Sequence, residues 1–284
     1  MKSKTLIRLI AAAAIPVILA CGFGAPAAPS QSDVATVVAS TVQAHTAVPN
    51  FNNVTYGNVS LTIPRGLATN ALTGTVPALT DSQQLGPWAI APEHIEILLD
   101  NYSQVTFYQR PQILVYPAED FSSMSDQVKE NIRRVQGIVN KTIPLAAENM
   151  PGIPFFNAGQ VIAAQMQTIS FKNGAGVRLV TQYGNGIAPV SNSGLFYHFQ
   201  GLTSDGKYYI IATLPTQLPF LPIDNNPSSP IPSGGIPFPQ NNASGPDFEN
   251  YYSQITNLIN AAQPDQFSPT LTSLDALIQS ISTQ

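Results

Sequence analysis

The chain has 284 residues, of which only 10% are charged, and its formal net charge is −4. An average globular protein carries about 25% charged residues. Contacts with nucleic-acid phosphates or with anionic lipid need several Lys or Arg side chains on one face, and no large basic cluster follows residue 8. We therefore expect neither a nucleic-acid partner nor a polybasic membrane contact, and no motif for a cofactor is present.

The first 20 residues have the pattern of an export signal. Lys2, Lys4 and Arg8 precede an uncharged, mostly apolar run at residues 9–20. A membrane-spanning helix needs about 20 apolar residues, so a basic start and this short run are typical of a cleaved signal peptide. We expect residues 1–20 to be removed, which leaves 9 basic and 16 acidic side chains and a net charge of −7.

Cys21 directly follows this segment and is the only cysteine of the chain. The run Ile18-Leu19-Ala20-Cys21 resembles the lipobox of bacterial lipoproteins, with Leu19 where that family usually has a small residue. The resemblance implies cleavage before Cys21, diacylation of its sulfur and a lipid-anchored protein on the extracytoplasmic side of the cell membrane. Several acyl chains hold a protein on a membrane better than one. The alternative is a plain signal peptide with an incidental cysteine.

The segment at residues 21–50 reads as a flexible tether, and residues 51–284 as one globular α+β domain. The tether begins with GFGAPAAPSQS, which is rich in small residues and proline, and it includes His45, which we expect to be solvated. The runs FQGLTSDGKYY and DALIQS resemble segments of uncharacterised extracytoplasmic lipoproteins, and that resemblance implies no particular activity. A domain of this length can bury a hydrophobic core large enough for a stable fold.

Strands are predicted by alternating apolar residues. The run NVSLTIP places Val59, Leu61 and Ile63 on one face, EHIEILLD does the same with Ile95, Ile97 and Leu99, and QRPQILVYP with Ile113 and Val115. Prolines on both sides of the last run indicate either an edge strand or two strand ends.

Two hairpins are predicted after residue 160. The first turns at residues 173–176, where the sequence is Asn-Gly-Ala-Gly. The second turns at Asp205-Gly206, because both positions tolerate a positive φ. Counting outward pairs Ser204 with Lys207, and both faces of this second hairpin then carry apolar residues. A strand pair covered on both faces belongs in the interior of a sheet.

Three helices are predicted. The first has an apolar stripe at Met124, Val128, Ile132, Val135 and Val139, with Ser125 as N-cap. Two more end the chain, at residues 247–262 and 268–282, the last one capped by Ser268 and Pro269. Residues 215–247, between the second hairpin and these last two helices, are rich in proline and glycine, so we expect a long loop that packs in part.

Together these elements predict an α+β fold, a mostly antiparallel sheet covered by about three helices. An α/β/α sandwich is the more specific arrangement that the element order allows.

Candidate chemistry is sparse. His94 and Glu96 share one face of a predicted strand with Asp100, which favours either a metal-assisted hydrolase or a solvated face with an ion pair to Arg110. Zinc sites use three or four ligands, and the only other histidines are His45 and His198.

Ser204 and Lys207 have the S-x-x-K spacing of penicillin-recognising enzymes, but those need a helix start, and here the spacing falls on a predicted turn. His198 is expected to be a packed, hydrogen-bonded residue of its strand. Trp88 lies in a predicted loop, either as a core residue or as an exposed ligand-binding residue.

The leading interpretation is therefore a membrane-anchored lipoprotein with a binding or structural role rather than an enzyme. Its partner would be an envelope protein, an envelope polymer or a small molecule, and the alternative is an envelope hydrolase that uses His94 and Glu96.

Overall fold

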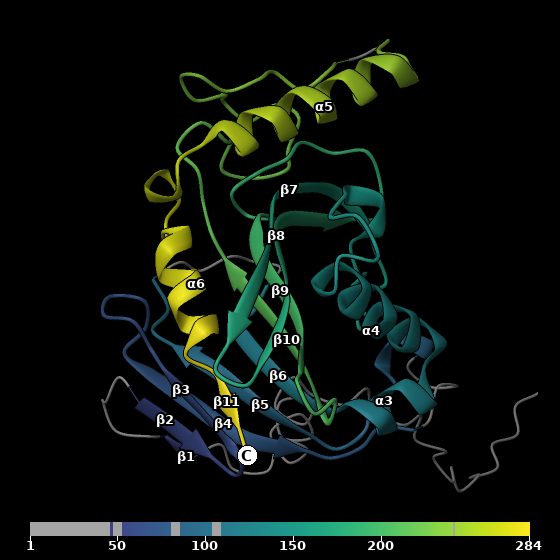
Figure 1. The fold of residues 1–284 in the computed structure, drawn as a ribbon. Coiled ribbons are helices and arrows are strands. Elements are labelled where there is room, and N and C mark those ends of the chain that lie inside the picture. Colours follow the sequence, from purple (N-terminus) through teal and green to yellow (C-terminus); the bar gives the residue numbers. More distant parts are fainter. Residues whose placement is uncertain (1–45, 48–52, 81–85, 104–108, 241) are drawn as a thin grey trace, which may run out of the picture. The chain divides into compact units, whose positions relative to one another are not determined.

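The computed structural model describes residues 46–47, 53–80, 86–103, 109–240 and 242–284. These residues form two antiparallel sheets and four α-helices (Figure 1). The large sheet has the order β1-β4-β5-β6-β10-β9-β8-β7. Its strands are β1 (Thr46–Ala47), β4 (Asn70–Val76), β5 (His94–Asp100), β6 (Gln112–Pro117), β7 (Gly159–Phe171), β8 (Gly174–Gly184), β9 (Phe196–Thr203) and β10 (Tyr208–Pro215). The small sheet has the order β11-β3-β2, from β2 (Asn53–Tyr56), β3 (Val59–Thr62) and β11 (Ser282–Thr283).

Helices cover both faces of the large sheet, which confirms the predicted α+β class with a mostly antiparallel sheet. The helices α3 (Ala118–Met124) and α4 (Asp126–Val139) enclose one core against it. On the other face, α5 (Gly245–Ala261), α6 (Leu271–Gln279) and the small sheet enclose a second core (Figure 1). The described chain therefore has the three layers that the sequence left open, with α3 as a short helix beyond the three predicted ones.

The β9–β10 hairpin has the predicted register. Leu202 pairs with Tyr209 and Gly201 with Ile210, and the hairpin lies inside the sheet between β6 and β8. Its turn is closed by the N–H of Gly206, which donates to the carbonyl of Thr203 at 2.9 Å. All eight residues of β9 are buried, because each face of this strand contacts a different core.

The first hairpin turns earlier than predicted. Phe171 pairs with Gly174, so the turn is Lys172-Asn173 and both Gly174 and Gly176 belong to β8. A Cβ on Gly176 would lie 2.2 Å from the carbonyl oxygen of Gln200 on β9. These glycines therefore let two strands and their aromatic neighbours approach closely, a role that glycine has in strands as well as in turns.

The position of β6, the N-cap of α6 and the strand β1 each differ from a prediction or decide between two predicted alternatives. β6 is an interior strand, so its flanking prolines mark strand ends rather than an edge. The N-cap of α6 is Thr270, whose hydroxyl accepts from the N–H of Ser273, while the backbone of Ser268 pairs with Gln217. β1 lies within the range predicted to be a tether and pairs with β4.

The proline-rich segment between β10 and α5 packs in part, as predicted. It contributes Leu218, Phe220, Leu221 and Phe238 to the core under α5 and α6. Phe238 contacts the ring of Tyr251 on α5 edge-on, with centroids 5.0 Å apart. Buried aromatic contacts of this kind fix a loop that has no regular backbone pairing.

Candidate ligand-binding cavities

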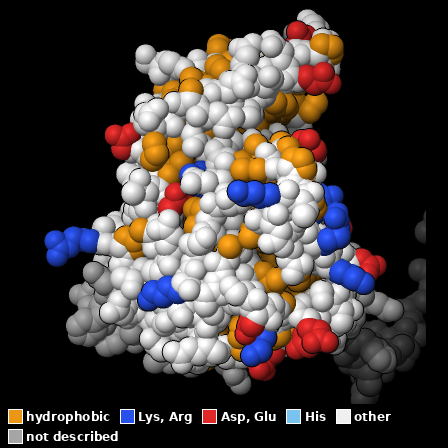
Figure 2. Space-filling view, viewed as in Figure 1, with side chains coloured by type: hydrophobic (Ala, Val, Ile, Leu, Met, Phe, Trp, Pro, Cys, Tyr) orange, Lys and Arg blue, Asp and Glu red, His pale blue; other side chains and the backbone are white. Residues whose placement is uncertain are grey.

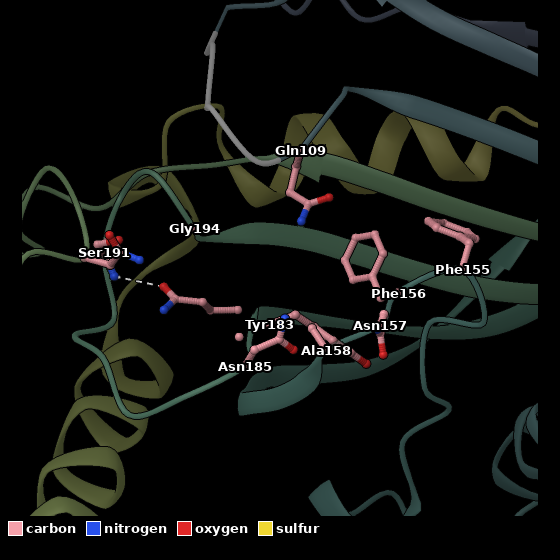
Figure 3. Close-up of a pocket in the computed structure, with 12 residues that line it drawn as sticks. Gln109, Phe155, Phe156, Asn157, Ala158, Tyr183, Asn185, Ser191 and Gly194 are labelled. Carbon is pink, nitrogen blue, oxygen red and sulfur yellow. Dashed lines mark hydrogen bonds between the residues drawn. The ribbon is translucent and has the colours of Figure 1, made fainter. Parts of the chain in front are cut away.

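A cavity with a volume of about 420 Å³ lies next to the end of β8 (Figure 3). Its lining combines aromatic rings with side-chain amides, and none of the described residues in it is charged. The aromatic rings come from Phe155, Phe156 and Tyr183. The amides come from Gln109, Asn157, Gln182, Asn185 and Asn225. We call this site the amide cavity.

The aromatic rings form one connected cluster. Phe156 contacts Phe155 and Tyr183 edge-on, with centroid distances of 5.2 and 5.3 Å, and it reaches Phe196 of β9 at 6.0 Å. The hydroxyl of Tyr183 accepts a hydrogen bond from the N–H of Ile153. Burial raises the pKa of Tyr183 to about 12. The cluster therefore offers half-buried, uncharged ring surface that is anchored in the sheet.

One wall of the amide cavity is the loop at residues 185–195. The side chain of Gln182 holds this loop, because its Oε1 accepts from the N–H of Ser191, the bond dashed in Figure 3, and its Nε2 donates to the carbonyl of Pro189, both at 3.0 Å. Gly194 lies against this amide, and a Cβ there would be 2.7 Å from Oε1. Gln182 is thus committed to holding the wall, and Gly194 makes room for it.

Hydrogen bonds to two tyrosines of α5, and others from an asparagine of the loop itself, hold the same loop in place. The N–H of Val190 donates to the hydroxyl of Tyr251 at 3.0 Å, and the hydroxyl of Tyr252 donates to the carbonyl of Ala188 at 2.8 Å. The Nδ2 of Asn192 donates to the carbonyls of Leu218 and Leu221 in the proline-rich segment. Side-chain hydrogen bonds therefore fix this wall, so the cavity is already formed in the protein without a ligand.

A second cavity of about 400 Å³ lies over β5 and β6 and shares Phe155 with the amide cavity. It contains three of the residues that the sequence singled out, Trp88, His94 and Glu96, together with Arg110 and Gln112. We call it the histidine cavity. Gln109 of the amide cavity and Arg110 of the histidine cavity are consecutive in the chain, so the two cavities adjoin.

His94 is half-buried and oriented by its neighbours. Its Nδ1 is 2.9 Å from the carbonyl of Pro92 and therefore carries the proton, and its ring stacks on Tyr116 at 4.4 Å. Burial lowers the pKa of His94, although the bond to Pro92 and the carboxylate of Glu96 oppose that shift. The imidazole is therefore neutral near pH 7, and its Nε2 is a hydrogen-bond acceptor.

Glu96 and Arg110 form the predicted ion pair, with Oε1 and Nη1 3.8 Å apart. The predicted solvated face is wrong, since Glu96 is only 9% exposed and lies in the cavity wall. The turn η1 (Pro87–Ala89) contributes Trp88 and Ala89 to the lining of the same cavity. The side chain of Arg110 is 67% exposed and lies at the mouth.

Trp88 lies on that turn and is 39% exposed, which agrees with the exposed alternative rather than with the core one. Its ring lies over Gly86, where a Cβ would be 2.6 Å from the ring carbons. Gly86 also has a φ of +85°, a value that L side chains rarely adopt. The backbone of Gly86 therefore sets the position of the indole at the histidine cavity.

The other predicted candidates have structural surroundings. Ser204 and Lys207 lie in the hairpin turn, and Lys207 is 3.3 Å from Asp205. His198 is fully buried, its Nδ1–H donates to the carbonyl of Ala212 at 2.9 Å, and its Nε2 accepts from the amide of Gln200 at 2.7 Å. Cys21 and His45 lie outside the described residues.

The described residues contain neither a metal-ligand cluster nor a membrane-crossing helix. Within these ranges, His, Cys, Asp and Glu side chains form no group of three or more that could hold a metal ion. No described helix is long and apolar enough to cross a membrane. On the face seen in Figure 2, charged side chains are scattered among uncharged ones.

The amide cavity was missed at the sequence level. Its lining comes from segments that are far apart in the chain, and asparagine is common in ordinary turns. The one usable signal is the run Pro-Phe-Phe-Asn-Ala at residues 154–158, where two adjacent aromatic residues precede an asparagine in a stretch with no strand or helix pattern.

Comparison with known proteins does not assign the chain to a family. No protein-family model matches the chain, and searches of curated proteins and of solved structures found no similar protein. Function must therefore be inferred from the sequence and the geometry of the cavities.

Proposed function

We propose that this protein is a membrane-anchored extracytoplasmic lipoprotein whose domain binds a ligand in the amide cavity and the adjoining histidine cavity. The lipobox-like run that ends at Cys21 supports the anchor. The observation that carries the binding role is the amide cavity, about 420 Å³ in volume and lined by half-buried rings and amides. Ligand sites are usually concave, largely preformed, and lined by apolar surface with a few polar groups.

The firmly held wall supports binding further. A loop that is already ordered loses little conformational entropy when a ligand arrives, so less of the interaction energy is lost. Val190, Ser191 and Asn192 each have a backbone or side-chain bond that holds the loop in place.

Native mass spectrometry of the full chain, purified in mild detergent from its original host, tests the binding role. We expect a bound non-lipid mass that leaves on denaturation and that is lost from a Phe156→Ala variant. The matched control is Leu145→Ala, an exposed apolar residue that lines neither cavity. A ligand-free wild-type protein from host membranes would contradict the proposal.

The anchor is tested separately by Cys21→Ala. We expect the wild type to partition into the detergent phase and the variant to appear as unprocessed precursor or in the aqueous phase. Mass spectrometry of the mature N-terminus would identify the acyl chains. A processed Cys21→Ala variant that still partitions with membranes would show that the anchor proposal is wrong.

A second candidate function, an envelope hydrolase, is favoured by one observation. The histidine cavity holds a neutral imidazole and a 9% exposed carboxylate, His94 and Glu96, on the same strand face. Such a pair can transfer protons in general acid–base catalysis. Turnover of purified envelope polymers that is lost in both His94→Ala and Glu96→Gln would support this function, and equal activity of the wild type and both variants would exclude it. Metal analysis of the same samples tests the metal-assisted form.

A further inference from the structure

We infer that the ligand of the amide cavity is a neutral oligosaccharide, with one sugar unit on the aromatic cluster and the rest of the chain extending past Phe155 into the histidine cavity. This inference rests on the proposed binding function and names its substrate class. Three independent features of the lining carry it: the rings, the amides and the absence of charge.

The rings provide a stacking surface. Phe155 and Phe156 are both half-buried, and their planes are 83° apart at a centroid distance of 5.2 Å. A pyranose ring presents C–H groups on its faces, and aromatic rings carry a negative face that attracts such groups. Two rings at a near right angle can contact one face and one edge of the same sugar, which a flat aromatic surface cannot do.

The amides provide hydrogen bonds that the protein itself does not use. Asn157, Asn185 and Asn225 are exposed at the cavity, and their side chains make no hydrogen bond to any residue in the described part of the chain. Each amide carries a donor and an acceptor. Sugar hydroxyls also donate and accept at once, so three amides around one cavity match a hydroxyl-rich ligand.

The contrast with Gln182 strengthens this point. That amide lines the same cavity, but both of its polar atoms are already bonded to the loop at residues 185–195. The cavity therefore has one amide that builds the wall and three that are available to a ligand. Available amides in a cavity are costly to bury under an apolar ligand, because each would lose its water without a replacement. An acyl chain is thus a poor occupant.

Among the residues that the structure describes, the lining of the amide cavity carries no charged side chain. A phosphate, a carboxylate or an ammonium group would lose its water there without gaining a partner of opposite charge, which is strongly unfavourable. A peptide also presents backbone groups that prefer a regular strand edge, whereas this lining combines loop side chains with Gln182 and Tyr183 at the end of β8, an interior strand. A neutral sugar meets both constraints.

Phe155 explains why more than one sugar unit fits. It lines both cavities, and the histidine cavity beyond it has the 39% exposed ring of Trp88 as a second stacking surface. The Nε2 of His94 and the amide of Gln112 provide further hydrogen-bonding groups there. An oligosaccharide that bridges Phe155 therefore finds rings and polar atoms on both sides.

The test uses neutral oligosaccharides released from the envelope polymers of the source organism, separated from acidic ones by anion exchange. Binding to the full chain in mild detergent is measured by isothermal titration calorimetry, and by quenching of Trp88. We expect saturable binding that disappears when the oligosaccharides are oxidised with periodate, which destroys their vicinal hydroxyls. The combined variant Asn157→Ala/Asn185→Ala/Asn225→Ala should weaken binding at least about tenfold, since each lost hydrogen bond contributes a factor of several.

Asn250→Ala on α5 is the matched control, because this exposed asparagine lines neither cavity and should leave the affinity unchanged. Equal affinity of the triple variant and the control would overturn the inference. So would a co-purified ligand that is a peptide, a lipid or an anion and that depends on Phe156, although the proposed binding function would then stand. A protein that binds no envelope oligosaccharide and carries no co-purified ligand would overturn both.

Discussion

The Nε of Arg178 on β8 lies 3.3 Å from Oδ1 of Asp275 on α6, and both side chains are largely withdrawn from water, with 5% and 19% of their surfaces exposed. The hydroxyl of Tyr197 on β9 donates to the same carboxylate oxygen at 2.9 Å. Burial raises the pKa of Asp275, while the guanidinium of Arg178 opposes that rise. One carboxylate thus joins the last helix of the chain to two interior strands of the sheet.

Removal of this carboxylate is expected to destabilise the fold strongly. Asp275→Ala leaves Arg178 buried without a counter-charge, a change that typically costs about 3–5 kcal/mol of unfolding free energy. The double variant Arg178→Met/Asp275→Leu should recover much of that loss, because no charge is then left buried. Urea unfolding at pH 7.5 measures both. An Asp275→Ala variant as stable as the wild type would contradict the structural role assigned to the pair.

His198 is expected to make the protein less stable in mild acid. Complete burial lowers its pKa to about 4, below the value of about 6.5 in an unfolded chain. As pH falls, the unfolded chain binds a proton at this histidine before the folded chain does. The contribution of neutral His198 to the free energy of unfolding is therefore fully present above pH 6.5. It is lost as pH falls from there towards 4, by at most about 3 kcal/mol.

His198→Gln removes this titration while it keeps a polar side chain in the strand. Urea unfolding at several pH values between 7.5 and 4.5 should therefore show a shallower decline for the variant than for the wild type. Identical declines would mean that His198 is not held neutral by its surroundings.

Gly194→Ala is expected to damage the wall of the amide cavity. The added Cβ would lie 2.7 Å from Oε1 of Gln182 and would displace the amide that holds Ser191. We expect a loss of about 1–3 kcal/mol, the usual cost of leaving a buried polar group unpaired, together with weaker ligand binding. Gly186→Ala in the same loop is the control, because a Cβ added there would have no atom within 4 Å. Thermal unfolding compares the two variants, and equal melting temperatures would refute the prediction.

Trp88 offers a direct optical test of the histidine cavity, since it is the only tryptophan of the chain. Gly86→Ala should push the indole away from its position over Gly86 and increase its quenching by acrylamide. Gly66→Ala is a matched control, because Gly66 has a similar φ of +82° but no atom within 4 Å of an added Cβ. Both variants therefore introduce the same kind of backbone strain, but only Gly86→Ala should change the quenching of Trp88 fluorescence.

Local pattern predicted some elements in detail. The β9–β10 register follows from the turn at Asp205-Gly206 and from alternation, and both act between residues close in sequence. The first helix shows where such reasoning ends. Ile132 and Val139 of its predicted stripe do pack, half-buried, against the core, but the structure also turns Asn131 inward, where its amide donates to the carbonyl of Gly152 at 2.6 Å. The spacing of apolar residues cannot predict a buried polar residue whose hydrogen-bond partner is far away in the sequence.

The candidate site was predictable only in part. His94 and Glu96 share a strand face at a spacing of two, and Arg110 was placed on a neighbouring strand, so their proximity in the histidine cavity could be foreseen. The amide cavity could not, because Phe156, Tyr183 and Asn225 come from two loops and the end of β8, which are far apart in the sequence and meet only in the folded chain.

The sequence by itself determined the class of fold and its interior hairpin, because strand alternation, helical spacing and turn residues are properties of neighbouring residues. It also carries the lipobox-like run at Cys21 on which the anchor proposal rests. Only the tertiary structure decided which amides hold the loop at residues 185–195 and which are available to a ligand. That distinction depends on whether another atom lies within hydrogen-bonding distance, and such atoms come from parts of the chain that only folding brings together.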